Sequence, residues 1–292
     1  MNAEPGVYLG LTFEQYLAIE ATNNGSLSRL KKSPRHYRYA TSEESSSAKT
    51  LGVLAHGALL EPLEVLRRYV VMPDYAKHPA NRIKNGEATT FRTSWVLEQE
   101  SQFIAMHEGR QFVSQKEFDA MLAISHSVAS EPAARTILQS GGDSEVTIVW
   151  HDADTGVVCK GRIDKLNPPK LGDLKTSADV DKFRRSYRDF AYYRQLAFYL
   201  DGYAQLTGDI LEPWIVLVES APPYCVQVAP VCEEDIEFGR REYRRLLREL
   251  VRCREENDWP GPPSPEVWRL PEWFTEKSEV LELVIDGNKV RL

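Results

Sequence analysis

Residues 161–177, GRIDKLNPPKLGDLKTS, contain charged side chains inside two short runs that otherwise have the composition of buried strands. Charged groups are costly to bury unless they have a partner or a task. Successive strand residues point to opposite faces, so Asp173 and Lys175 project together while Leu174 points into the core. The NPPK turn predicts a hairpin that brings Asp164, at the end of the preceding strand, beside them. We therefore expect Asp164, Asp173 and Lys175 to face a common point.

Two carboxylates at one point, together with the main-chain carbonyl of Leu174, form an all-oxygen ligand set that suits Mg²⁺ or Mn²⁺. A lysine beside such an ion can orient and help to deprotonate a water for attack on a phosphodiester. The alternative is an exposed ion pair of Asp173 with Lys175 or Lys165, since Asp-x-Lys alone is expected roughly once by chance in a chain of this length. The apolar neighbours of these residues favour the metal site.

Composition is that of an ordinary globular protein, with 42% hydrophobic and 27% charged residues among 292. No apolar run approaches the roughly 18 residues that span a bilayer, and no signal peptide is apparent, so we expect a cytoplasmic protein with no membrane partner. The four cysteines form no CxxC pair. This spacing argues against a zinc ribbon and against a disulfide framework.

The distribution of basic residues is more informative than the net charge of −7, which does not indicate a nucleic-acid binder. Basic residues cluster in residues 28–40, 181–195 and 239–254. A solvated helix face explains any one cluster alone. The first two clusters alternate bases with tyrosines, which suits a surface that binds phosphates and stacks on bases or sugars.

The hydrophobic pattern predicts one α/β domain, residues 1–292, in three parts. Residues 1–140 indicate mainly helices, one of them LGVLAHGALLEP with His56, with Thr12, Ser26 and Ser114 as N-caps. Helices are expected at about 95–107 and 115–139 and polar breaks at 41–50 and 74–94. Residues 141–230 predict short strands, a helix at about 189–207, and strands at 214–220 and 224–229. Residues 231–292 predict a helix at about 232–256 and a Pro- and Trp-rich tail packed as an extended cap.

The ordered set of motifs resembles the PD-(D/E)XK nuclease superfamily and, within its RecB-like branch, the RecE (exodeoxyribonuclease VIII) type. Ile163-Asp164, eight residues, and Asp173-Leu174-Lys175 match the metal motif, with isoleucine in place of proline. QLAFY, from Gln195 to Tyr199, matches the Q-x-x-x-Y helix motif. LGVLAHGALLEP, NNGSLSRLKKSPRHYRY and LPEWF are similar to further segments of these proteins, so the resemblance spans nearly the whole chain.

The resemblance implies a restriction-endonuclease-like core, in which helices flank a mixed central sheet, with a helical N-terminal elaboration. It also implies two Mg²⁺ or Mn²⁺ ions per active site, bound by Asp164, Asp173 and His56. A lone histidine in an apolar helix is otherwise more often a core residue. Gln195 is expected near the scissile phosphate with Tyr199 supporting it; the alternative for both is simple helix packing.

Some candidates carry less support. Glu145 is either a further carboxylate near a metal or a solvated strand end. Five bases are expected, only as a group, to contact DNA phosphates: Lys160, Arg162, Arg185, Arg188 and Arg194.

The function implied is a Mg²⁺-dependent exonuclease that degrades linear double-stranded DNA from its ends, 5′ to 3′, in a bacterial host cell. It would leave single-stranded tails for a phage-type annealing protein in recombination. A homo-oligomeric ring, a tetramer, is implied as well and would turn basic faces inward. Two alternatives are a structure-specific endonuclease of the same fold and a DNA-end-binding accessory protein without turnover. A purely structural α/β domain would leave the ordered motifs as coincidence.

Overall fold

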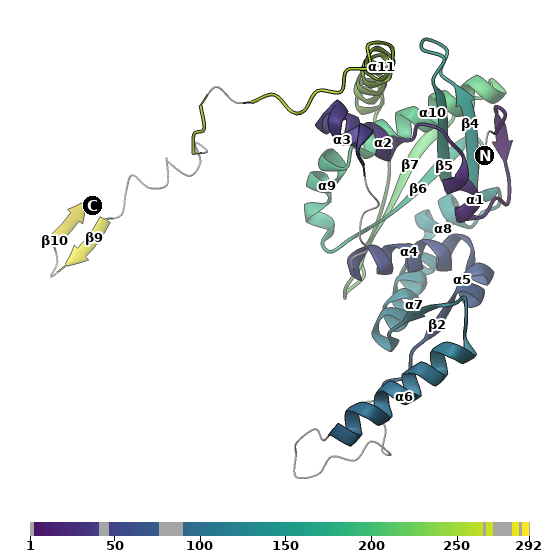
Figure 1. Ribbon diagram of the computed structural model, residues 1–292, viewed down its shortest axis with the longest axis vertical. Helices are drawn as coiled ribbons and strands as arrows, with labels where there is room; N and C mark the ends of the chain where they lie inside the picture. Colours follow the sequence, from purple (N-terminus) through teal and green to yellow (C-terminus); the bar gives the residue numbers. More distant parts are fainter. Residues whose placement is uncertain are drawn as a thin grey trace.

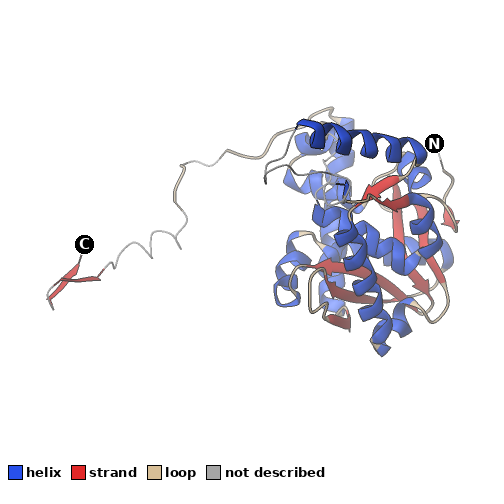
Figure 2. Ribbon diagram, turned by 90° about the horizontal axis from the view of Figure 1, so that it is seen from below, coloured by secondary structure: helices blue, strands red, loops and turns tan. Residues whose placement is uncertain are grey.

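The computed structural model describes residues 3–40, 47–75, 90–264, 267–270, 282–285 and 288–291. Its centre is a six-stranded sheet in the order β1-β4-β5-β6-β7-β8, with helices on both faces (Figures 1 and 2). The strands are β1 (Gly6–Tyr8), β4 (Asp143–His151), β5 (Val158–Asn167), β6 (Lys170–Ser177), β7 (Glu212–Glu219) and β8 (Val226–Pro230). The β6–β7 pair is parallel and the other neighbours are antiparallel, so the sheet is mixed, as the sequence predicts.

Two layers of helices enclose this sheet. The helices between β1 and β4 in the chain are α1 (Phe13–Ala18), α2 (Asn24–Lys32), α3 (Pro34–Arg38), α4 (Ser47–Leu60), α5 (Pro62–Arg68), α6 (Thr90–Met106), α7 (Gln115–Ser130) and α8 (Pro132–Leu138). The 3₁₀ turn η2 (Val180–Lys182), α9 (Phe183–Asp189) and α10 (Tyr192–Thr207) lie between β6 and β7, and α11 (Glu233–Glu255) follows β8. Two small pairs complete the described chain: parallel β2 (Tyr69–Val71) and β3 (Gln111–Val113), and antiparallel β9 (Glu282–Ile285) and β10 (Asn288–Arg291). No helix of the described chain combines the length and the apolar character needed to cross a membrane.

The core lies on both faces of the sheet. On one face, strand side chains pack against Leu196 and Phe198 of α10 and Leu246 of α11. On the other face, Leu174 of β6 packs in a cluster formed with α4, α7 and α8. Leu174 therefore points away from α10, as the strand alternation predicts, and its two neighbours in β6 point toward α10.

Helix starts follow local capping chemistry. Thr12 and Ser114 are N-caps, as expected, and both form capping boxes. The cap of α2 is Asn23 rather than Ser26, because Ser26 occupies the third helical position and returns a hydrogen bond to the cap. The single helix expected at about 115–139 is wrong: it divides into α7 and α8 at Pro132, which has no backbone N–H to continue the hydrogen bonds of α7.

Several short elements differ from the expectation. The helical N-terminal part also supplies β1, β2 and β3, each only three residues long. The expected cap formed by the tail is correct at Trp259, whose ring stacks on Tyr37 at 6.0 Å between centroids, and wrong at Trp268, which is 89% exposed. Helices α4 and α6 begin inside the polar breaks, whose residues 41–46 and 76–89 lie outside the described chain, as do residues 271–274 of LPEWF.

Candidate active site

The candidate site lies where β5 and β6 stop pairing with each other. Their register runs from Asn167 opposite Lys170 to Lys165 opposite Gly172. At the next residue of β5, Asp164, a side chain replaces the backbone as the hydrogen-bond partner of β6. Its Oδ2 accepts a hydrogen bond from the Leu174 N–H at 2.7 Å. A carboxylate thus stands between two strands of the sheet, and the other charged groups gather around it.

Three side chains from three elements converge at this carboxylate. His56 of α4, Glu145 of β4 and Asp164 of β5 have nitrogen and oxygen atoms that all lie within 4.8 Å of one another. His56 Nδ1 is 3.6 Å from Asp164 Oδ2. The β4–β5 register, which pairs Ser144 with Lys165 and continues on both sides, places Glu145 opposite Asp164.

Glu145 has an unusual backbone for a strand residue. Its φ is +54°, in the left-handed region that residues other than glycine rarely adopt. Such conformations persist only where the surrounding structure imposes them, and they concentrate at functional sites. The sequence allows Glu145 to be either a carboxylate near a metal or a solvated strand end. In the structure, Glu145 lies in the cluster with His56 and Asp164.

A second, connected group lies on the α10 face of β6. Lys175 Nζ is 2.6 Å from Asp173 Oδ2, and both side chains are buried. Gln195 Nε2 donates to Asp173 Oδ1 at 3.1 Å and lies 3.4 Å from the Tyr199 hydroxyl. The ring of Tyr192 covers the Lys175 ammonium at 4.8 Å. The backbone of Leu174 joins this group to Asp164, so the two groups form one site.

Gly161 of β5 permits Tyr199 to approach the sheet. A Cβ at this position would lie 2.7 Å from two ring carbons of Tyr199, closer than any real side chain tolerates. The absence of a side chain therefore fixes how near α10 comes to β5. Within α10, the Tyr199 hydroxyl lies 3.4 Å from Gln195 Nε2.

Burial dominates the acid–base properties of the site. It raises the pKa of Asp173 to about 6, and it raises the pKa values of Asp164 and Glu145 as well. Burial alone would lower the pKa of Lys175, but the nearby Asp173 and Asp164 carboxylates raise it. Burial lowers the pKa of His56, so the imidazole is available in its neutral, metal-binding form.

The donors fit a divalent cation. Carboxylate oxygens suit Mg²⁺ and Mn²⁺, and an imidazole nitrogen is compatible with the second. Asp173 Oδ2 is buried and, apart from its ion pair with Lys175, receives no directed hydrogen bond. The Leu174 carbonyl borders the same region, 3.4 Å from Lys175 Nζ. Buried carboxylates with this little compensation are stabilised by a bound cation.

Two bases expected to contact DNA hold the N-terminal segment onto the sheet instead. Lys160 Nζ donates to the carbonyls of Tyr16 and Ile19 at 2.8 and 2.7 Å, at the end of α1. Arg162 donates to Glu145 and, at 2.8 Å, to the carbonyl of Leu11. Both are less than a tenth exposed. In this conformation neither offers a donor to a phosphate, so the structure does not support that role.

Arg194 is the third base to be corrected. It is fully buried and lies against α2, with Nε 2.9 Å from Asn24 Oδ1 and Nη1 3.2 Å from Glu242 of α11. Its guanidinium fastens helices together and does not reach solvent. Arg185 and Arg188 of α9 are exposed, as a DNA contact would require.

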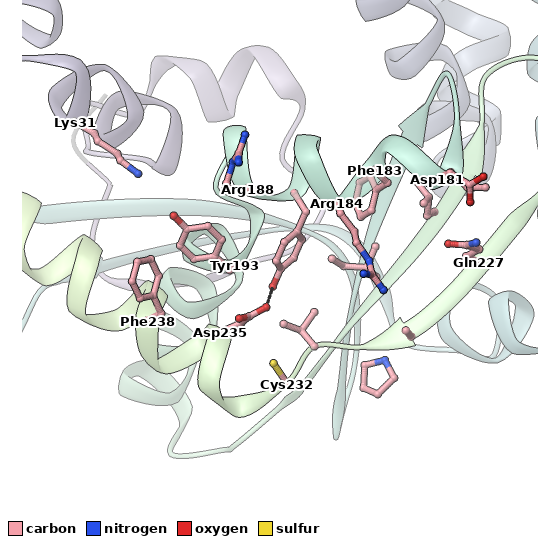
Figure 3. Close-up of a pocket in the computed structure, with 17 residues that line it drawn as sticks. Lys31, Asp181, Phe183, Arg184, Arg188, Tyr193, Gln227, Cys232, Asp235 and Phe238 are labelled. Atoms are coloured by element: carbon pink, nitrogen blue, oxygen red, sulfur yellow. Dashed lines mark hydrogen bonds between the residues drawn. The ribbon is translucent and has the colours of Figure 1, made fainter. Parts of the chain in front are cut away.

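A large pocket lies beside the site, between α9, the start of α11 and the edge strand β8 (Figure 3). It holds about 1130 Å³ and is lined by aromatic rings together with bases and acids. Tyr187 donates a hydrogen bond to Asp235 at 3.0 Å within the pocket. Arg184 and Asp181 lie on the side of this bond that faces away from Phe238 (Figure 3). None of the metal-ligand candidates lines this pocket.

The mixed sheet, the carboxylate between two of its strands and the adjacent Asp-x-Lys pair define a nuclease fold of the PD-(D/E)XK kind. Residues 25–264 match the family described as "PDDEXK-like domain of unknown function (DUF3799)". The match covers most of the chain, and the protein belongs to this family. The predicted superfamily and core are thus confirmed, while the RecE type within it stays a prediction.

A solved structure agrees with this assignment. The chain is similar to a protein from Eubacterium rectale, described as a "putative exonuclease", with a TM-score of 0.58 and 12% identity over 93% of this chain and 99% of that chain. At this identity the likeness shows a shared fold. No protein with a curated description matches the sequence.

Proposed function

We propose that this protein is a metal-dependent deoxyribonuclease that hydrolyses phosphodiester bonds at the site around Asp164. The observation that carries the proposal is the meeting of Asp164 with Glu145 and His56, within 4.8 Å, directly beside the Asp173–Lys175 pair. A structural ion pair explains Asp173 and Lys175 but not the additional buried carboxylates. Perturbed acids clustered with a buried lysine are typical of catalytic sites.

Each side chain has a distinct part in this proposal. His56, Glu145 and Asp164 would hold the cation, with Asp173 and the Leu174 carbonyl at its border. A divalent cation bound there would polarise the phosphodiester and offset the negative charge that develops on it.

The Lys175 side chain orients the attacking water. Its ammonium is held by Asp173 at 2.6 Å and presents its remaining N–H groups to a water or a phosphate oxygen. Gln195 fixes the other oxygen of Asp173, and Tyr199 in turn supports Gln195. These two contacts limit the orientations that Asp173 and Lys175 can adopt, which is the usual requirement for an efficient catalytic group.

The finer features of the proposal rest on the resemblance to RecE-like exonucleases. They are Mg²⁺ as the metal, attack from the ends of linear duplex DNA in the 5′ to 3′ direction, a tetrameric ring, and the supply of single-stranded tails for annealing. The exonuclease description of the similar Eubacterium rectale protein supports the end-dependent part.

Digestion of end-labelled linear duplex DNA and covalently closed circular DNA tests the proposal, each with Mg²⁺ and with EDTA. We expect Mg²⁺-dependent loss of the linear substrate, early release of the 5′ label and an intact circle. Cleavage of the circle would replace the exonuclease with an endonuclease of the same fold. Binding without cleavage of either substrate would contradict nuclease activity and favour a DNA-end-binding protein.

A further inference from the structure

The basic segments of this acidic protein differ in how far the fold neutralises them. Several arginines of α11 face carboxylates: Arg240 pairs with Asp201 at 2.7 Å, and Arg245 and Arg252 pair with acids one turn further along the helix at 3.0 and 2.8 Å. These bases already have partners. The segment from 239 to 254, although rich in arginine, is therefore not a free cationic surface.

The bases of α2 and α3 have a different environment. Arg29 and Lys32 of α2 and Arg35 of α3 are exposed. Among the residues that the structure describes, no carboxylate forms an ion pair with any of the three, whereas Lys31, on another side of α2, pairs with Glu242 at 2.6 Å. Three cations thus extend into solvent from two consecutive helices.

These cations line a hollow. The α2–α3 groove, a cavity of about 720 Å³, is bordered by Gly25, Ser28, Arg29, Lys32, Arg35 and His36, and none of its lining residues is acidic. Gly25, Ser28 or Arg29, and Lys32 follow the three- and four-residue spacing that places them on one face of α2. The groove is a surface of one charge sign on a protein whose net charge is −7.

The α2–α3 groove continues into the candidate active site. A neighbouring cavity of about 400 Å³ shares Gly25 and Ser28 with it and is lined on its other side by Gln195 and Tyr199. Gln195 hydrogen-bonds Asp173 at 3.1 Å. A ligand that follows α2 from Lys32 toward Gly25 therefore arrives at the side chains that hold the catalytic candidates.

The buried Arg194 holds α2 in this position. It donates to Ser28 Oγ at 2.5 Å and to Asn24 Oδ1 at 2.9 Å, while the next residue, Gln195, contacts Asp173. Helices α2 and α10 contact each other (Figure 1). Adjacent residues of α10 thus connect the groove to the site.

We propose that the α2–α3 groove binds the phosphate backbone of the DNA that enters the active site, with Arg29, Lys32 and Arg35 as its phosphate contacts. This inference rests on the proposed function, because it supplies the path for that substrate. An unpaired cationic groove suits a polyanion, since each phosphate neutralised releases counterions. The larger pocket of Figure 3 fits a polyanion less well, because Asp181 and Asp235 stand among its bases.

The test compares two triple variants that remove the same charge. The groove variant is Arg29→Gln/Lys32→Gln/Arg35→Gln, and the control is Arg245→Gln/Arg248→Gln/Arg252→Gln on α11, whose side chains are also exposed. Binding of a fluorescent linear duplex is measured by anisotropy in EDTA over a range of salt concentrations, and the KM for cleavage is measured in Mg²⁺. Circular dichroism and thermal melting confirm that both variants are folded.

We expect the groove variant to bind duplex DNA at least about tenfold more weakly at 0.1 M salt, with a salt slope smaller by about one for each phosphate that it no longer neutralises. The control should bind as the wild type does. Equal binding, salt slope and KM in the groove variant and the wild type would overturn the groove assignment, even if the wild type cleaves DNA.

The outcome also separates this inference from the proposed function. Groove-dependent binding by a wild type that hydrolyses nothing in Mg²⁺ would keep the groove and reject the nuclease. A wild type that binds no duplex DNA at any salt concentration would overturn both.

Discussion

The ammonium of Lys175 lies 2.6 Å from Oδ2 of Asp173, and the same carboxylate accepts a hydrogen bond from Gln195 on its other oxygen. The pair is buried between β6 and α10, so each charge depends on the other. Removing one member of a buried ion pair typically costs about 3–5 kcal/mol, because the remaining charge is left without a partner. Yet the pair stands beside further carboxylates, an arrangement that stability alone does not require.

Lys175→Gln should lower the rate of DNA hydrolysis by about 10²–10³-fold, the usual cost of removing one donor that orients a reactant or stabilises the charge of the transition state. Thermal melting and single-turnover cleavage are measured on the same preparation. Lys165→Gln is the matched control, because that lysine is also buried in the β5–β6 hairpin but donates to Gly142 and Ser144, away from the site. A folded Lys175→Gln enzyme of wild-type rate would contradict the assignment.

The pKa of Asp173 predicts a pH dependence of stability in EDTA. Its folded-state value of about 6 lies above the 3.8 of an unperturbed aspartate, so folding favours the protonated form. The stabilisation is complete below pH 3.8 and is lost as the pH rises through about 6, a change of about 3 kcal/mol. Denaturant titrations between these pH values should show Asp173→Asn losing less stability than the wild type. Parallel curves for the two proteins would show that Asp173 titrates normally.

Metal binding should stabilise the protein through His56, Glu145 and Asp164. Mg²⁺ or Mn²⁺ that binds only the folded state raises the free energy of unfolding by about 1.4 kcal/mol for each tenfold excess over the dissociation constant. Thermal melting with and without metal should show this rise in the wild type and in the control Glu64→Gln, whose half-exposed carboxylate pairs with Arg67 of the same helix. It should be absent in Glu145→Gln and Asp164→Asn; a full rise in either would place the metal elsewhere.

Gly161→Ala should displace the ring of Tyr199 and lower activity, since the new Cβ would lie 2.7 Å from it. Overpacking of this kind typically costs about 1–3 kcal/mol. Gly202→Ala is the control, because its Cβ would meet the ring of Trp150 equally closely, at 2.7 Å, outside the site. Stability should fall in both variants, whereas kcat should fall only in Gly161→Ala. Equal kcat values would remove Tyr199 from the site.

Arg194→Met tests whether Arg194 holds helices together and makes no contact with DNA. The substitution leaves the Arg194 partners in α2 unsatisfied and removes one of the two cations that pair with Glu242, so it should destabilise the protein by about 3–5 kcal/mol. The salt slope of DNA binding in the folded variant should equal that of the wild type, because the Arg194 side chain is fully buried. A slope smaller by about one would return Arg194 to the DNA contacts.

The hairpin and its charged residues could be predicted from the sequence because they depend on local rules. Strand alternation alone places Asp173 and Lys175 on one face and Leu174 on the other, and the short turn after β5 fixes the neighbour of β6. The four-residue spacing of Gln195 and Tyr199 likewise places both on one face of α10. Local periodicity therefore captures the part of the site that lies within single elements.

The remainder depends on contacts between distant segments. The carbonyls that bind Lys160 belong to residues more than 140 positions away, so its sequence neighbours do not indicate that it is buried. Arg194 is similar, since its partners lie in α2 and α11. The left-handed backbone of Glu145 arises from the packing around β4 and β5, and no residue pattern signals it. Strand β1 forms only because β4 offers it an edge.

The most direct test of the central claim is the release of nucleotides from linear duplex DNA as Mg²⁺ is added, with wild-type protein and Asp164→Asn measured side by side. We predict hydrolysis by the wild type that rises with Mg²⁺ and stops in EDTA, and no hydrolysis by a folded Asp164→Asn variant. Metal-independent hydrolysis, equal rates in the two proteins, or no hydrolysis by the wild type at any Mg²⁺ concentration would contradict a metal-dependent nuclease site at Asp164.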